Sequence, residues 1–324
     1  MNKEYCVAIR TLGKAGDKYQ ALLDSLKSQT IQPKKILVYI AERYDLPKET
    51  INTEEYITCP KGMIRQRALD FKEIDTDWVL FCDDDVELKP DSVERLFNGV
   101  VKENGDCICA NTFPVNEYST FKKIKISIFS YTFPRKDDNF SFKILNCGTY
   151  TYNNNPQKDV MLTQSGAGPC CLCKMSTYRA IHFEDELWLD RFGYAYGDDL
   201  LFFYKMYLMG YKVLTHFNSG VLHLDAGTGN GNYEIWFRKG VALTFILPYR
   251  VKYDLLHNTC LKKVKVAFSM FVMYVEQIMV LPIKIIKHRN PIACMDYFHG
   301  IHDGWKYVHS NEYKKVPKFD KYVK

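Results

Sequence analysis

The chain has 324 residues, enough for one large domain or two small ones. Hydrophobic residues make up 47% and charged residues 25%, a balance that excludes a disordered protein, a collagen-like repeat and a coiled coil. The formal net charge of +6 is compatible with binding phosphates or an anionic membrane, and it is too small to indicate a nucleic-acid partner.

The first 110 residues alternate between short apolar runs and segments with helical periodicity. The apolar runs predict strands at 5–9, 36–40, around Ile57, 78–82 and 106–110. The segments between them predict helices at 19–28, 62–71 and 92–101. Strands separated by helices indicate a three-layer α/β domain with a mostly parallel sheet.

The pattern weakens from 113 to 164, where we expect a long excursion with a two-stranded ribbon or a helix around 122–131. Regular patterning then predicts helices at 177–182 and 199–209 and a strand at 211–214. From about residue 233 the chain is mainly helical and basic.

Residues 264–286 form the most apolar segment. Its longest charge-free run is 266–275, and Glu276, Gln277 and Pro282 interrupt the rest. Because a membrane span takes about twenty predominantly apolar residues, we expect none here. Basic residues flank the segment, so two readings stay open: an amphipathic helix lying on an anionic membrane through 262–289, or a helix packed on the α/β domain.

The chain contains eleven cysteines, and residues 1–16 hold no apolar run of the length of a signal peptide. We therefore expect a cytoplasmic protein with reduced cysteines. The C-x-C and C-C-x-C clusters at 107–109 and 170–173 favour buried thiols over a zinc site.

The strongest local signal is Asp83-Asp84-Asp85, which directly follows the apolar run WVLFC. Three carboxylates at the carboxyl end of a strand lie where open α/β sheets bind ligands, and their mutual repulsion favours a bound cation. Mg²⁺ or Mn²⁺, shared with substrate phosphates, is the natural candidate. The alternative is an acidic loop that faces water. A phosphatase motif fits poorly, because Glu87 stands where such a motif has a different residue.

Five segments, in this order, resemble the motifs of the inverting, family 2 type glycosyltransferases with the GT-A fold. They are SLKSQTIQPKKILVYI, KGMIRQRALDF, FCDDDVELKPDSVERL, FGYAYGDDLLFFYKMYLMGYKVL and HFNSGVLHLD, and the resemblance covers about residues 4–240. It implies a metal-dependent, hexosyltransferase-like enzyme that moves one sugar from a nucleotide-sugar donor to an acceptor hydroxyl, with inversion.

On the donor side, the resemblance places Asp83 and Asp85 in the family's Asp-x-Asp motif, with Asp84 between them. It implies that Asp85 coordinates the metal, that Asp83 lies near the ribose and the metal, and that His223 completes the metal or diphosphate site. For a lone histidine in an apolar strand, a purely structural role is an equally good alternative.

Further donor contacts are implied for Thr11, Glu42 and Arg67. Glu42 is the only acidic candidate after the second strand, where the family often has a pair, and Ala68 replaces the Asn expected after Arg67. These departures leave UDP, GDP and dTDP open as the donor nucleotide.

On the acceptor side, Gly197-Asp198-Asp199 matches the family's acidic pair at a helix start. The match implies that Asp199 is the general base and that Asp198 contacts the acceptor. Either residue has the alternative role of a helix cap. Trp188 and Tyr196 flank the motif and are candidates for stacking on an acceptor sugar, with core packing as the alternative.

Together these inferences predict a GT-A-like catalytic domain at 1–235, with a nucleotide-sugar-binding half at 1–110 and an acceptor half at 111–235. A helical, basic C-terminal region would follow at 236–324. We expect a role in cell-surface polysaccharide or glycolipid synthesis on a glycan or lipid-linked acceptor, at the inner face of the membrane. Two rival functions remain: a nucleotidyltransferase that makes the sugar nucleotide, and a non-catalytic nucleotide-sugar binder.

Overall fold

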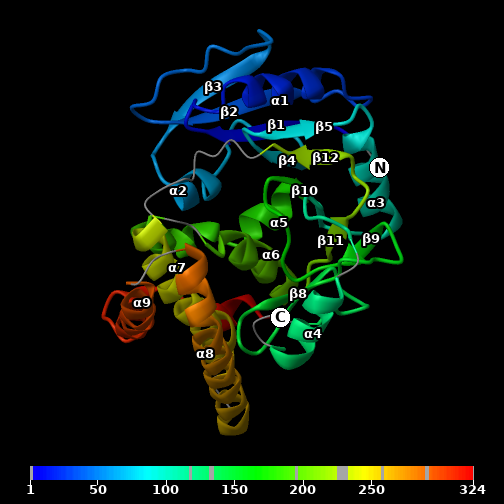
Figure 1. The fold of residues 1–324 in the computed structure, drawn as a ribbon. Helices are drawn as coiled ribbons and strands as arrows, with labels where there is room; N and C mark the ends of the chain where they lie inside the picture. Colours follow the sequence, from blue (N-terminus) through cyan, green and yellow to red (C-terminus); the bar gives the residue numbers. More distant parts are fainter. Residues whose placement is uncertain are drawn as a thin grey trace.

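The computed structural model describes residues 3–116, 119–130, 135–193, 196–224, 233–256, 259–288 and 292–323. Its centre is an eight-stranded sheet with the order β3-β2-β1-β4-β10-β6-β11-β9 (Figure 1). The strands are β1 (Tyr5–Thr11), β2 (Lys35–Ala41), β3 (Glu54–Cys59), β4 (Trp78–Asp83), β6 (Cys107–Ala110), β9 (Val160–Leu162), β10 (Cys170–Lys174) and β11 (Val213–His216). Neighbours from β3 to β4 are parallel, whereas β10 is antiparallel to both β4 and β6.

The central strands are apolar along almost their whole length because both of their faces are covered. In β1, Tyr5, Val7 and Ile9 belong to one core cluster, while Cys6 and Ala8 belong to the cluster on the other face. Side chains of a strand point alternately to the two faces, so a strand buried on both sides reads as a continuous apolar run. These continuous apolar runs are the sequence pattern from which the central strands were predicted.

Helices cover both faces of the sheet, which confirms the predicted three-layer α/β class. One face is covered by α1 (Asp17–Lys27) and α3 (Ser92–Lys102). The other is covered by α5 (Met175–Ala180), the 3₁₀ segment η1 (Phe183–Phe192) and α6 (Asp198–Leu208).

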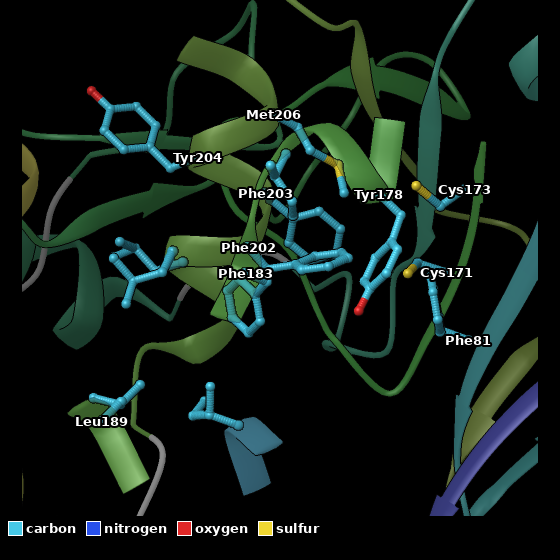
Figure 2. Close-up of a cluster of buried hydrophobic side chains, with 14 of the residues drawn as sticks. Phe81, Cys171, Cys173, Tyr178, Phe183, Leu189, Phe202, Phe203, Tyr204 and Met206 are labelled. Atoms are coloured by element: carbon cyan, nitrogen blue, oxygen red, sulfur yellow. The ribbon is translucent and has the colours of Figure 1, made fainter. Parts of the chain in front are cut away.

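Aromatic rings fill the layer between the sheet and α6. Figure 2 shows Phe202 of this helix next to Phe183 and Tyr178, with Phe81 of the sheet on the far side of Tyr178. The ring centroids of Phe81 and Tyr178 are 5.1 Å apart, and those of Phe183 and Phe202 are 5.3 Å apart. This packing fixes the start of α6, which carries the predicted acidic pair.

The segment after β6 contains both features that its weak pattern left open. A helix, α4 (Thr120–Ile128), is followed by a ribbon of β7 (Phe142–Ile144) and β8 (Tyr150–Tyr152). A second antiparallel ribbon joins β5 (Val86–Leu88) to β12 (Val221–His223).

The C-terminal region is helical, as predicted. Its elements are α7 (Tyr233–Pro248), the π-helical segment η2 (Tyr249–Tyr253), the 3₁₀ segment η3 (Asp254–Leu256), α8 (Cys260–His288), α9 (Ala293–Val308), and the 3₁₀ segments η4 (Tyr313–Lys315) and η5 (Phe319–Tyr322). Residues of α7, α9 and η5 belong to the same core cluster as α6. The proposed division at residue 235 falls in the first turn of α7 and stays a prediction.

A buried ionic cluster connects the C-terminal region to the α/β domain. Glu186 of η1 accepts hydrogen bonds from Arg250 at 2.6 and 2.8 Å, and its carboxylate lies 2.8 Å from the ammonium of Lys205. The indole N–H of Trp188 donates to the same carboxylate at 2.7 Å. Glu186, Lys205 and Arg250 are at most 1% exposed, so the cluster is sealed from water.

Helix α8 projects from the body of the protein (Figure 1). Its segment Cys260–Ile283 is long and apolar enough to cross a membrane, although no such segment was expected from the sequence. The sequence criterion counted only uninterrupted charge-free residues, whereas charges at the ends of a span are tolerated. A core helix of a soluble protein meets the same criterion, and about a third of the most apolar stretch is buried against the protein.

The cysteines agree with the expectation of buried, inert thiols. Of the ten cysteines whose side chains are described, nine are buried and all ten are free. Burial raises the pKa of Cys109 to about 12, which keeps it as a thiol. Among the described residues, no group of three or more His, Cys, Asp or Glu side chains is gathered closely enough to hold a metal ion.

Candidate active site

The predicted donor residues meet at the carboxyl ends of β1 and β4, in a cleft of about 430 Å³. Parallel neighbours bring these strand ends together, as expected for a ligand site on an open α/β sheet. The lining side chains include Arg10, Thr11, Lys14, Lys61, Arg67, Asp83, Asp84, Asp85, Asp198, Asp199 and His223. Eight of the predicted site residues therefore share one cleft.

The first two carboxylates of the acidic triplet are held by residues at the end of β1. Asp83 pairs with Arg10, and its backbone N–H donates to the carbonyl of Pro169 at 2.8 Å. The hydroxyl of Thr11 donates to the carboxylate of Asp84 at 2.5 Å. Burial, with repulsion from the neighbouring carboxylates, raises the pKa of Asp84 to about 6.

Asp85 faces His223, which the β5–β12 ribbon brings next to the triplet. The Nε2 atom of His223 lies 3.3 Å from Oδ1 of Asp85, and the N–H of Leu224 donates to the carbonyl of Asp85 at 2.8 Å. His223 therefore points to the acidic triplet. The carboxylates supply the oxygen ligands that Mg²⁺ and Mn²⁺ prefer, and a divalent cation would relieve their mutual repulsion. Asp85 and His223 fit such an ion if substrate phosphates supply further oxygens.

Arg67 lies between the donor side and the acidic pair. It is carried by α2 (Met63–Arg67), which is shorter than the predicted 62–71 because the backbone leaves the helical conformation at Ala68, with φ −100° and ψ +19°. The carboxylate of Asp190 accepts hydrogen bonds from the N–H groups of Ile64 and Arg65, and so caps this short helix from η1.

The guanidinium of Arg67 bridges the acidic pair. Its Nη1 atom is 2.5 Å from carboxylate oxygens of both Asp198 and Asp199. Burial opposes the charge on Arg67, but Asp198, Asp199 and Asp83 outweigh it and raise its pKa. Burial also raises the pKa of Asp198, so the attraction of Arg67 only partly offsets the loss of water around that carboxyl.

Asp198 and Asp199 begin α6, as predicted, but the N-cap residue is Gly197, with φ +89°. A Cβ on Gly197 would lie 2.3 Å from Leu247, which is a second reason for glycine there. The side chain of Asp199 is 32% exposed and that of Asp198 is 14% exposed. Of the two carboxylates, that of Asp199 is therefore the more accessible from the cleft.

A second cavity, of about 680 Å³, lies on the other side of the acidic pair. Asp198 and Asp199 line both cavities, so the two meet at these carboxylates. Tyr196 lines the second cavity and is 43% exposed.

Two predicted site residues are not brought to either cavity. Trp188 is buried, donates its indole N–H to Glu186 and stacks on Tyr307. It packs the core, so the expected stacking on an acceptor sugar is not supported. Glu42 is exposed beyond the end of β2 and is not among the residues that line the donor cleft.

The sequence analysis did not assign several residues that shape the site. Lys14 and Lys61 line the donor cleft, both about 5.0 Å from the ring centroid of Tyr44. Nothing in the sequence distinguishes these two lysines from surface lysines. Only the fold brings them to the same edge of the donor cleft. Asp190 acts through hydrogen bonds to backbone N–H groups, which leave no sequence pattern.

Gly168 sets the position of the Asp199 carboxylate. Its N–H donates to Oδ2 of Asp199 at 3.0 Å, and a Cβ placed on it would lie 1.8 Å from Oδ1. We expect Gly168→Ala to displace this carboxylate and lower kcat by tenfold or more, since displacements of about 1 Å are that costly. The midpoint temperature of thermal unfolding should change little, because the atoms displaced are the carboxylate oxygens at the end of the Asp199 side chain. Unchanged kcat would contradict the assigned position.

The fold and the site together define a class of protein. The chain has the GT-A fold: it aligns with the structure of S. aureus TarS 1-349 with a TM-score of 0.51 and 10% identity, over 94% of this chain and 81% of that one. The structure of S. aureus TarS 1-349 in complex with UDP-GlcNAc aligns with a TM-score of 0.52 and 10% identity, over 99% and 84%. At this identity the likeness shows the fold alone.

The family follows from the sequence. The family described as Glycosyl transferase family 2 matches residues 17–185, just over half of the chain, and the protein belongs to this family. This confirms the resemblance seen in the motifs. The match includes the Asp83–Asp85 triplet and Arg67, while Asp198, Asp199 and His223 lie beyond it. No curated protein matches the chain in sequence.

Proposed function

We propose that this glycosyltransferase moves a single sugar from a UDP-sugar to an acceptor hydroxyl, with inversion at the anomeric carbon. The observation that carries the proposal is the meeting of two cavities at Asp198 and Asp199, with the Asp83–Asp85 triplet and His223 in the first. A donor in the first cavity and an acceptor in the second would meet at these carboxylates.

The first cavity suits a nucleoside diphosphate. Arg10, Lys14 and Lys61 line it and supply positive charge for phosphates, and Thr11 lies at the end of β1 for the nucleoside. We choose uridine because the TarS structure of the same fold was solved with UDP-GlcNAc. A nucleotidyltransferase, by contrast, would not explain the acidic pair between two cavities.

Asp85 and His223 are the residues that would hold a divalent cation, which would offset negative charge on the departing diphosphate. We expect Asp85→Ala to weaken Mn²⁺-dependent UDP binding at least tenfold, and excess EDTA to weaken wild-type binding in the same way. Isothermal titration calorimetry with UDP, with and without Mn²⁺, measures both effects. Asp91→Ala, on the exposed start of α3, is the control. If wild type and Asp85→Ala bind UDP with equal affinity, both with and without Mn²⁺, this assignment is contradicted.

The second half of the proposal concerns the base. The acceptor hydroxyl loses its proton to the Asp199 carboxylate as its oxygen attacks the anomeric carbon from the face opposite the diphosphate. The bond from that carbon to the phosphate oxygen breaks, and UDP leaves with the electron pair. Arg67 and the N–H of Gly168 hold the carboxylate in place.

The second cavity is the proposed acceptor site. Its volume of about 680 Å³ exceeds that of the donor cleft, and its wall includes Tyr150, Leu247, Pro248 and Met273. Aromatic and aliphatic walls suit sugar rings and apolar groups alike. We therefore propose a glycan or lipid-linked acceptor, in polysaccharide or glycolipid synthesis.

A further inference from the structure

The outer face of α8 is a continuous apolar surface. Its large hydrophobic residues are between 40% and 82% exposed. These residues, which we call the α8 stripe, are Leu261, Val264, Phe268, Phe271, Val275, Ile278, Met279, Ile283 and Ile286.

The inner face of the same helix is packed. Val266, Met270, Met273 and Leu281 are at most 7% exposed. At roughly 100° per residue, the α8 stripe covers an arc of about 140° on the side opposite these residues. A two-stranded coiled coil buries a narrower seam, so this width argues against pairing with a second copy of the helix.

Helix α4 carries a second surface of the same kind. Phe121, Ile124 and Ile128 are 52% to 68% exposed at helical spacing, and they form the α4 stripe. The helix comes from a distant part of the sequence, yet both helices lie in the half of the molecule away from β2 and β3 (Figure 1). Two separate elements in this half of the molecule (Figure 1) therefore carry exposed apolar residues.

Both stripes are accompanied by lysines. Lys122, Lys123 and Lys125 lie on α4, and Lys262, Lys263 and Lys265 lie in the first turns of α8. The α8 sequence then contains no further lysine or arginine until Lys284. At the same helical spacing, Lys125 of α4 and Lys265 of α8 lie at the edge of their stripes. An apolar face with a cation at its edge matches an anionic bilayer, in which acyl chains take the apolar groups and headgroups take the ammonium groups.

We propose that the α4 and α8 stripes together dock this protein on an anionic lipid bilayer, with both helices at the level of the headgroups. Met273, on the inner side of α8, lines the cavity beside Asp199, so docking would bring the acceptor cavity close to the lipid surface. The proposal concerns a surface distinct from the donor cleft and does not depend on the proposed reaction.

The test is sedimentation of the whole protein with vesicles of phosphatidylcholine alone or with 30% phosphatidylglycerol. We expect binding to the anionic vesicles, and at least tenfold weaker binding for Phe268→Glu/Phe271→Glu. A second variant, Lys262→Glu/Lys265→Glu, should lose the preference for anionic lipid. Leu46→Glu, at a 58% exposed residue outside both helices, is the matched control and should bind like wild type.

Three results would overturn the proposal. Equal binding of wild type and Phe268→Glu/Phe271→Glu would show that the stripe is not the contact. A dimer in light scattering that the same variant converts to a monomer would assign the stripe to a second copy. Resistance of membrane-bound protein to alkaline carbonate extraction would assign α8 to a span. UDP binding in solution, measured on the same samples, separates these results from a failure of the proposed function.

Discussion

Replacing Asp199 with asparagine should lower kcat by about 10²–10⁴-fold, the usual contribution of a general base. The amide has the size of the carboxylate and keeps an oxygen for the N–H of Gly168, which donates to Asp199 at 3.0 Å. It cannot accept the acceptor's proton at neutral pH. The loss should therefore fall on the chemical step, measured as UDP release under saturating donor and acceptor.

Donor binding provides the control for this variant. The phosphate-facing residues lie around the Asp83–Asp85 triplet, so the affinity of Asp199→Asn for UDP should stay within about threefold of wild type. Asp198→Asn tests the choice between the two acids, because its side chain is 14% exposed against 32% for Asp199. If Asp198→Asn loses more activity than Asp199→Asn, the roles of the two residues are reversed.

The largest effect on stability is expected for Glu186→Gln. This change leaves the charges of Lys205 and Arg250 buried with no carboxylate, a loss that typically costs about 3–5 kcal/mol. Urea unfolding followed by circular dichroism measures the difference. Glu184→Gln, two residues away and exposed, should change the free energy of unfolding by less than about 1 kcal/mol.

The same cluster predicts a pH dependence. Burial alone would raise the pKa of Glu186, but Arg250 and Lys205 outweigh it and lower the pKa to about 2. A carboxyl whose pKa is lower in the folded state stabilises the protein above its unfolded pKa, near 4.5, and loses that contribution as the pH falls towards 2. The gap in stability between wild type and Glu186→Gln should therefore narrow from pH 5 to pH 2. A gap that stays constant over this range would contradict the assigned charge state.

The strands of the donor half were predictable because a strand that is buried on both faces has an uninterrupted apolar sequence. β1, β2 and β4 are apolar runs, and the ligand-binding edge follows from the acids that come after β4. The antiparallel insertion of β10 between β4 and β6 was not predictable, because a five-residue strand carries no signal of its direction. The position of His223 follows from the pairing of β12 with β5, which is also non-local.

The errors have physical causes as well. A tryptophan beside an acidic motif has the same sequence signature in a cleft and in a core, and the hydrogen bond of Trp188 to Glu186 placed it in the core. The bridging of Asp198 and Asp199 by Arg67 joins residues far apart in the chain. Only the family resemblance singled out both Arg67 and the Asp198–Asp199 pair as site residues. The sequence left both interpretations of α8 open, a membrane-surface helix and a helix packed on the domain, because it does not show which side of the helix is packed.

The most direct test of the central claim is release of nucleoside diphosphate from a panel of UDP-, GDP- and dTDP-sugars with Mn²⁺. Wild type, Asp85→Ala and Asp199→Asn should be compared, and donor binding measured by calorimetry on the same samples. We predict release from UDP-sugars that is at least tenfold lower in both variants, with UDP binding weakened at least tenfold only in Asp85→Ala. Binding of no nucleotide by wild type, or release of pyrophosphate from a nucleoside triphosphate and a sugar phosphate, would contradict the account.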